Sequence, residues 1–287
     1  MKMSKGYLYS ILSVLLMALA GPLQKKSMEG LTPFHVLFFS NFAAFVASAV
    51  AVFRTRDQFV FKLNKKVLFL AFLYLIAQVS FSFAINKENP VIVNSISRSY
   101  LVFNFMISFF ILKESFSLRQ IGAALLILTG TFGLSIIPND DLKWSLAASL
   151  TIFYSFLFSI HNSLLKFSQN QNAYQLILLQ NGLCCFVFSV SLLYQPLNFK
   201  ENTVTILYSC LAGFFSSFLG FVLYKKGLHY LRFSEASSVR SLSPIIGFAA
   251  IYPFYPIELT LFQKVALLLL LIGGLGFNSK RKSDEPA

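Results

Sequence analysis

The chain has 287 residues, of which 56% are hydrophobic and 12% charged, and its formal net charge is +13. Soluble domains average about 25% charged residues, whereas here apolar runs of about 20 residues, long enough to cross a bilayer, recur along the whole chain. This composition excludes a soluble protein and predicts an all-α, multi-pass protein of the lipid bilayer. The basic residues lie mostly between the apolar runs, where they set topology, so no nucleic acid is expected as a partner.

We predict ten membrane-spanning helices, joined by connections too short for a separate soluble domain. The first resembles a secretion signal, because Lys2 and Lys5 precede an apolar core and an Ala-Leu-Ala tripeptide. We keep it as a span, because its polar stripe continues through Pro22 and Gln24 and because an internal repeat needs it. The ten predicted spans cover residues 6–24, 33–53, 66–85, 90–112, 118–137, 143–162, 173–194, 203–224, 234–252 and 260–277.

The basic residues also predict the orientation of the chain. With the N-terminus inside, sixteen Lys and Arg residues fall in the inner segments and six in the outer ones, as the positive-inside rule requires. We therefore expect both termini in the cytoplasm and the protein in the plasma membrane, which in bacteria is the inner membrane.

The chain contains an internal repeat. Segments of the first half match segments of the second at offsets of 140 to 143 residues, and small loop insertions account for the drift. The matching segments are 94–99 with 236–241, 120–130 with 263–273, and Lys26 and Asn41 with Lys166 and Asn181.

Each copy of the repeat holds five predicted spans. Because five is odd, the second copy must be inverted relative to the first. The expected architecture is two inverted five-helix repeats, residues 6–137 and 143–278, followed by a cytoplasmic tail, residues 279–287. Secondary transporters built this way bind their substrate near mid-membrane, where the two halves meet.

The end of the first copy resembles a known family. Glu114 follows the fourth span, Gln120 comes six residues later, and Gly-Ala-Ala-Leu-Leu-Ile-Leu-Thr-Gly follows directly after Ile121. This pattern resembles the EamA repeat of the drug/metabolite transporter superfamily; in the second copy Glu258 lies five residues before Gln263. The resemblance implies a ten-helix permease. Members carry amino acids, nucleotide sugars, S-adenosylmethionine, drugs and other metabolites, so the resemblance does not name the substrate.

An arginine lies inside the apolar fourth span. Arg98 is about 12 Å along the helix from Pro90, and a charge at that depth costs at least a few kcal/mol unless it faces a cavity or a partner. Asn94, Ser97 and Asn104 recur near it on one face of the helix. We predict that this face is the polar wall of a cavity.

The repeat places a second arginine, Arg240, at the position equivalent to Arg98, with Ser237 and Ser241 beside it. Guanidinium groups match the geometry of carboxylates and phosphates, so we predict that both arginines bind an anionic group of the substrate. The alternative is that each reaches the nearer interface or bonds helix-end carbonyls.

Carboxylates are absent from the interior of the predicted spans. All eleven acids lie in loops, at helix ends or in the tail, so neither arginine has an internal counter-ion, and no buried acid offers a proton relay. His161 ends the sixth span and is a candidate for titration, although a single histidine near an interface is more often simply hydrogen-bonded. This pattern favours uniport or exchange over proton-driven pumping.

Other polar residues in the spans are candidates for the cavity wall or for hydrogen bonds between helices. Gln78 and Ser82 lie one turn apart in the third span, and Ser216 belongs to a serine stripe in the eighth. We predict a wall made by the third, fourth, eighth and ninth helices, as the resemblance also implies. The candidate substrate-binding residues are Arg98, Asn94, Ser97, Asn104, Arg240, Ser237, Ser241, Gln78, Ser82 and Ser216.

Glycines cluster in the fifth and tenth spans, where they permit close helix contact. The glycines are Gly122, Gly130 and Gly133 in the fifth span and Gly273, Gly274 and Gly276 in the tenth. The contact can lie within one chain or at a homodimer seam, so a monomer and a homodimer both stay open.

The sequence offers no metal-binding spacing of His, Cys and acidic residues and no nucleophile–base pair. We therefore expect neither an enzyme nor a cofactor. We predict a secondary transporter that moves a small polar or amphipathic metabolite by alternating access, as a uniporter or an exchanger. A substrate with a carboxylate or phosphate is preferred: an amino acid, an S-adenosyl compound or a nucleotide-like molecule. The alternatives are a non-transporting membrane scaffold or receptor-like subunit, and a channel.

Overall fold

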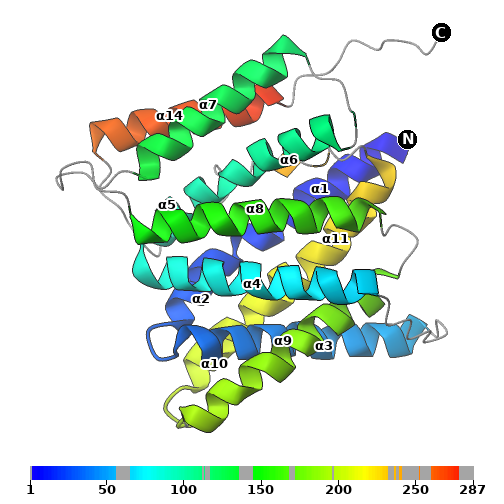
Figure 1. Cartoon of the computed structure of the whole chain (residues 1–287). Helices are drawn as coiled ribbons and strands as arrows, with labels where there is room; N and C mark the ends of the chain where they lie inside the picture. Colours follow the sequence, from blue (N-terminus) through cyan, green and yellow to red (C-terminus); the bar gives the residue numbers. More distant parts are fainter. Residues whose placement is uncertain are drawn as a thin grey trace.

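The computed structural model describes residues 2–55, 65–111, 113, 117–135, 145–167, 172–195, 197–231, 236, 239–240, 252 and 260–277. Over these residues every regular element is helical, and the long helices form one bundle (Figure 1). The elements are α1 (Lys2–Ala18), α2 (Ala20–Ser27), α3 (Pro33–Thr55), α4 (Lys65–Lys87), α5 (Pro90–Ile96), η1 (Ser97–Ser99), α6 (Tyr100–Phe110), α7 (Leu118–Ser135), α8 (Leu146–Phe167), α9 (Ala173–Tyr194), α10 (Thr203–Gly213), η2 (Phe214–Gly220), α11 (Phe221–Tyr230) and α14 (Leu261–Phe277).

Six stretches of the described chain are helical, long and apolar enough to cross a membrane. Two shorter apolar helices, Leu118–Gly133 and Leu261–Gly273, lie where the fifth and tenth spans are predicted. The predicted ninth span, residues 234–252, falls almost entirely outside the described residues. The all-helical, multi-pass fold is therefore confirmed, and the count of ten spans stays a prediction.

Three of the predicted spans are not single continuous α-helices in the structure. The first is interrupted at Leu19, between α1 and α2. Pro22 explains this break, because it has no N–H to donate to the carbonyl of Ala18, four residues earlier. The equivalent helix of the second half, α8, has Asn162 where the repeat places Pro22, and it runs unbroken.

The fourth predicted span changes from α to 3₁₀ geometry over η1, at Arg98 itself. The Ser97 hydroxyl donates to the carbonyl of Asn94 at 2.8 Å, and the Ser155 hydroxyl of α8 donates to the carbonyl of Ser97 at 3.0 Å. Side chains therefore satisfy carbonyls at the point where the helix tightens, which non-α backbone at membrane depth requires.

The eighth predicted span contains a π-helical segment, η2, between α10 and α11. Gly213 ends α10 where the backbone of Ser40 in α3 lies so close that a Cβ at this position would overlap it. The Ser216 hydroxyl donates to the carbonyl of Ala212 at 2.7 Å. Single-turn π segments inside α-helices are frequent at functional sites.

The main contacts between helices are the same when the two halves of the repeat are interchanged. The repeat makes the first to fifth spans equivalent to the sixth to tenth. The closest helix pairs are α7 with α14, α3 with α9, α4 with α8 and α1 with α11, and Figure 1 shows α7 beside α14 at one edge of the bundle. When each helix is replaced by its equivalent in the other half, the pair α7–α14 stays the same pair, and so does α3–α9. The pair α4–α8 becomes α1–α11.

The same exchange holds for individual residues at the α7–α14 contact. A Cβ on Gly130 would lie 2.5 Å from the carbonyl oxygen of Ala266, and a Cβ on Gly273 would lie 2.7 Å from that of Ala123. At the offset of 143, Gly130 is equivalent to Gly273 and Ala123 to Ala266. This glycine contact therefore lies within one chain.

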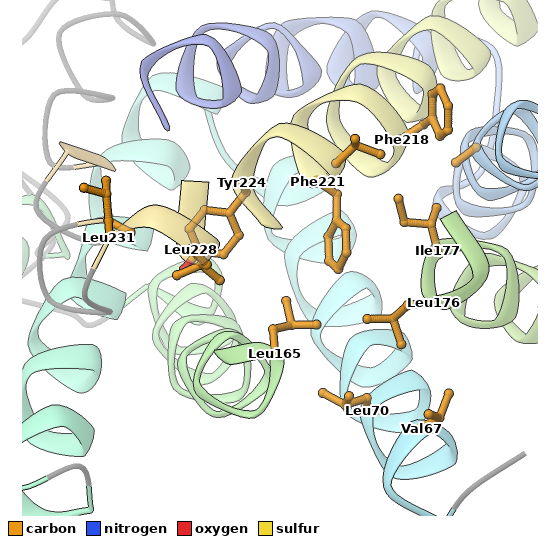
Figure 2. Packing of buried hydrophobic residues seen from close by; sticks show 13 residues of the cluster. Val67, Leu70, Leu165, Leu176, Ile177, Phe218, Phe221, Tyr224, Leu228 and Leu231 are labelled. Atoms are coloured by element: carbon orange, nitrogen blue, oxygen red, sulfur yellow. The ribbon is translucent and has the colours of Figure 1, made fainter. Parts of the chain in front are cut away.

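The largest buried apolar cluster lies between α4, α8, α9, η2 and α11. Figure 2 shows Phe221 and Tyr224 of α11 directed into it, opposite Leu165 and Leu70. Large apolar side chains on the outer faces are exposed, for example Phe42 and Val50 on α3. In a multi-pass membrane protein such faces meet lipid.

Candidate functional site

A cavity of about 100 Å³ lies at the centre of the bundle. All three interrupted spans contribute to its wall: Gly21 and Gln24 come from α2, Arg98 from η1 and Ser216 from η2. Non-helical backbone at membrane depth is tolerated where it is buried in protein or lines a cavity. The residues that line it are Val14, Met17, Ala18, Ala20, Gly21, Gln24, Tyr74, Gln78, Phe81, Asn94, Ser97, Arg98, Tyr100, Tyr154, Phe158, Ser216, Ser217, Phe221 and Arg240.

Arg98 is partly exposed and lines this cavity. Its Cζ lies 6.0 Å from the centroid of the Tyr100 ring. Its Nε is buried and has no hydrogen-bond partner among the described residues. The arginine therefore faces the cavity, as the sequence predicts.

Arg240 lines the same cavity and is only 3% exposed. Its Cζ lies 3.8 Å from the centroid of Tyr224, 5.3 Å from that of Phe158 and 5.9 Å from that of Tyr100. These rings stabilise the guanidinium through cation–π attraction, which is strongest where water is excluded. Tyr100 lies near both arginines, so the two repeat-related charges share one site.

The charges of the site are not balanced by carboxylates among the described residues. The ion pair that the described residues form joins Lys26 to Glu29 at 2.8 Å, with both side chains about half exposed. Neither residue lines the cavity. None of the described residues that line the cavity is acidic. A cavity with two guanidinium groups and aromatic walls attracts an anion.

Six of the ten predicted site residues line the cavity: Gln78, Asn94, Ser97, Arg98, Ser216 and Arg240. Among these, the Asn94 amide donates to the carbonyl of Pro90 at 2.8 Å and packs against Gly21, where a Cβ would lie 2.5 Å from its nitrogen. The glycine thus lets α2 approach α5 beside the site.

The other four predicted residues do not line the cavity in the described structure. Asn104 is buried and its Oδ1 accepts a hydrogen bond from Ser159 of α8 at 2.5 Å, so it joins helices. Ser82 is 1% exposed and lies apart from the cavity wall. Ser237 and Ser241 lie outside the described residues.

The prediction of the wall-forming helices was incomplete. The third, fourth and eighth spans contribute as expected, and the ninth does so through Arg240. The first and sixth spans also contribute, through α1, α2 and α8. The sequence interpretation also missed the aromatic side chains Tyr74, Tyr100, Tyr154 and Phe158. On α8, Tyr154 and Phe158 stack at 5.2 Å between ring centroids, and Phe81 packs on Tyr154 at 4.6 Å. Together they form an apolar, flat-sided wall beside the arginines.

Comparison with known proteins gives two findings. A sequence model of the EamA-like transporter family matches residues 4–136 and 140–279. A crystal structure of a protein that is 13% identical superposes with a TM-score of 0.68, over 95% of this chain and 96% of that chain. At this identity the likeness establishes a shared fold alone. No curated protein matches the chain in sequence.

Proposed function

Because the chain belongs to the EamA-like transporter family over both of its halves, we propose that it is a secondary transporter for a small metabolite with a carboxylate or phosphate group. An amino acid, an S-adenosyl compound and a nucleotide-like molecule all fit this description. The observation that carries the proposal is the central cavity, where Arg98 and Arg240 meet aromatic rings and where none of the described lining residues is acidic. An anion entering this cavity supplies a negative charge that no described lining residue carries.

Transport proceeds by alternating access between the two halves, as a uniport or an exchange. The three helix interruptions support this step, because half-helices on either side of a break can tilt separately. All three meet at the cavity, so a tilt of any half-helix changes access to the bound solute. The aromatic wall of Tyr154 and Phe158 suits a planar ring on that solute.

The transporter lies in the plasma membrane, the inner membrane of a bacterium, with both termini in the cytoplasm. The support for this orientation is the distribution of basic residues, sixteen on the side of the termini against six on the other. Cysteine substitution at Lys2 and Lys200, followed by labelling of intact cells with a membrane-impermeant maleimide, tests it. Labelling of the Lys2 variant and protection of the Lys200 variant would contradict the orientation.

A ligand screen with the purified protein tests the substrate class. A ligand that binds only the folded state raises the melting temperature. We expect anionic amino acids, nucleotides or S-adenosyl compounds to raise it for the wild type, and the rise to be lost in Arg98→Ala. Losing charge-assisted hydrogen bonds of this kind weakens binding roughly 10- to 100-fold.

The matched control is Arg119→Ala, which removes an exposed arginine at the start of α7. In this variant the ligands should raise the melting temperature as much as in the wild type. Stabilisation by cations alone, or an equal response in Arg98→Ala and the wild type, would refute an anion site at Arg98.

A further inference from the structure

The imidazole of His161 lies directly behind the wall of the central cavity. His161 is on α8 and is 0% exposed. Its ring centroid lies 5.6 Å from that of Tyr74, 6.0 Å from that of Phe221 and 6.4 Å from that of Phe158. Each of these three rings also lines the cavity, so one layer of aromatic side chains separates the imidazole from the site.

The hydrogen bonds of this histidine do not fix its protonation state. Its Nε2 lies 2.8 Å from the side-chain nitrogen of Gln180 on α9, and its buried Nδ1 has no partner among the described residues. Histidines with a structural role usually donate Nδ1–H to a carbonyl or carboxylate, which sets the tautomer. The Gln180 amide can serve both states: its NH₂ donates to neutral Nε2, and after rotation its oxygen accepts from protonated Nε2.

Among the residues that the structure describes, the charges near His161 are positive. The Arg240 Cζ lies 5.3 Å from the centroid of Phe158, the ring that also stacks on the imidazole. No acidic residue occurs in α4, α5, η1, α6, α9 or α11, the elements around α8. The titratable groups that these elements and α8 carry near the site are Tyr74, Tyr100, Tyr154, Tyr224, Cys184, Arg98 and Lys225.

We propose that His161 is a proton-binding site coupled to occupancy of the cavity. While the cavity holds no anion, the arginines repel a positive imidazolium. An anion that binds them removes this repulsion, and neutral Nε2 then accepts one proton from solvent. When the anion leaves on the other side of the membrane, the repulsion returns and Nε2 releases the same proton there.

One proton therefore crosses the membrane together with one anion. Moving a proton inward is thermodynamically equivalent to moving a hydroxide outward, so the process is equivalent to exchange of the anion for hydroxide. This inference rests on the proposed function, because it needs an anion in the cavity. It also supplies a driving force that the acids of the chain do not provide.

The electrostatic step can be tested without a substrate, because removing a cavity arginine mimics an anion. The chain has three histidines, and ¹⁵N-histidine NMR of the purified protein follows their protonation. His161→Gln identifies the resonance. In Arg240→Gln the midpoint of His161 protonation should rise by about one pH unit, the effect of a unit charge at roughly 10 Å in a medium of effective dielectric constant about 20.

Two variants serve as controls. Arg240→Lys keeps the charge and Arg119→Gln removes an exposed one, so both should leave the midpoint where it is in the wild type. Arg98→Gln provides the same test where Arg240→Gln does not fold. An unchanged midpoint in the folded Gln variants, or an imidazole that stays neutral in them down to about pH 5, would overturn the proposal.

Proteoliposomes test the coupling itself. With an acidic exterior, the wild type should accumulate the anionic amino acids or nucleotides that stabilise it, and His161→Gln should lose this gradient-driven accumulation while keeping solute counterflow. Equal accumulation in the two proteins would overturn proton coupling. If the wild type moves none of these solutes, the transport proposal fails, whereas the NMR result still decides whether His161 responds to the arginines.

Discussion

Two arginines inside an apolar bundle must be stabilised by something other than water. Among the described residues this is done by aromatic faces and not by carboxylates: Tyr224 covers Arg240 at 3.8 Å, and Tyr100 lies within about 6 Å of both arginines. Aromatic faces hold a cation without neutralising it. Guanidinium groups held in this way keep their charge, and this charge is what attracts the anion in our proposal.

We expect Tyr224→Leu to destabilise the protein by roughly 1–3 kcal/mol, because it removes the ring on which Arg240 lies and part of a buried cluster. Tyr224→Phe keeps the ring face and should lose clearly less stability than Tyr224→Leu. Chemical unfolding in detergent, followed by circular dichroism, measures both. Equal stability of the Leu and Phe variants would show that the stacking contributes nothing.

Polar residues that line the cavity were predictable where they contrast with their apolar helix. Arg98, Asn94 and Ser97 stand out in an apolar span, and their spacing placed them on one face. Tyr154 and Phe158 could not be singled out, because they are two among 12 tyrosines and 34 phenylalanines in spans that are apolar all round. The available signal was their position next to Ser155 and Ser159, one turn apart.

The helix interruptions, in contrast, depend on contacts between segments far apart in sequence. Pro22 marks the break between α1 and α2 locally. The 3₁₀ turn at Arg98 is supported by Ser155 of α8, and the π segment follows the close approach of Gly213 to Ser40. A pattern of apolar residues along one span carries no information about such partners, so the 3₁₀ and π segments could not be predicted from it.

The half-helix α2 is attached to α4 by Lys25. Its Nζ donates to the carbonyls of Ile85 at 2.8 Å, Glu88 at 3.2 Å and Asn86 at 3.3 Å, at the C-terminal end of α4. A cation is favourable at this end of a helix, where carbonyls lack intrahelical partners. Because α2 also lines the cavity with Gln24, this attachment holds one side of the cavity in place.

We expect Lys25→Ala to free α2 and to expose the cavity on this side. A cysteine at Gln24, in a protein whose three native cysteines are replaced by alanine, should then react several-fold faster with a membrane-impermeant maleimide. The neighbouring Lys26→Ala is the control, because Lys26 forms an exposed ion pair of the kind worth at most about 1 kcal/mol. The same rate in both variants would exclude a role for Lys25 in closing the cavity.

The two halves of the molecule are joined by contacts that exchange under the repeat. The order of matching segments predicted this relation, since the offsets of 140 to 143 pair each span with its counterpart. Which spans pack against each other across the two halves was not predictable, because a repeat shows which spans are equivalent and not which spans touch. The structure shows these contacts, through the α7–α14 glycines and the α3–α9 pair.

We expect Gly130→Leu and Gly273→Leu each to destabilise the protein by about 1–3 kcal/mol or more, because a side chain at either position meets the backbone of the facing helix. Gly122→Leu in α7 is the control, since a Cβ there meets nothing within 4 Å. Thermal unfolding in detergent compares the three. If Gly122→Leu lost as much stability as the other two variants, the loss would come from replacing a glycine within the helix and not from the contact with the facing helix.

The central claim is that a solute anion binds Arg98 in the cavity between the two halves and is carried across the membrane. Counterflow of a radiolabelled anionic amino acid or nucleotide into proteoliposomes preloaded with the same unlabelled solute measures this most directly. We predict saturable counterflow with the wild type and with Arg119→Ala, and its loss in folded Arg98→Ala. Undiminished counterflow in Arg98→Ala, or flux that does not saturate, would contradict the account.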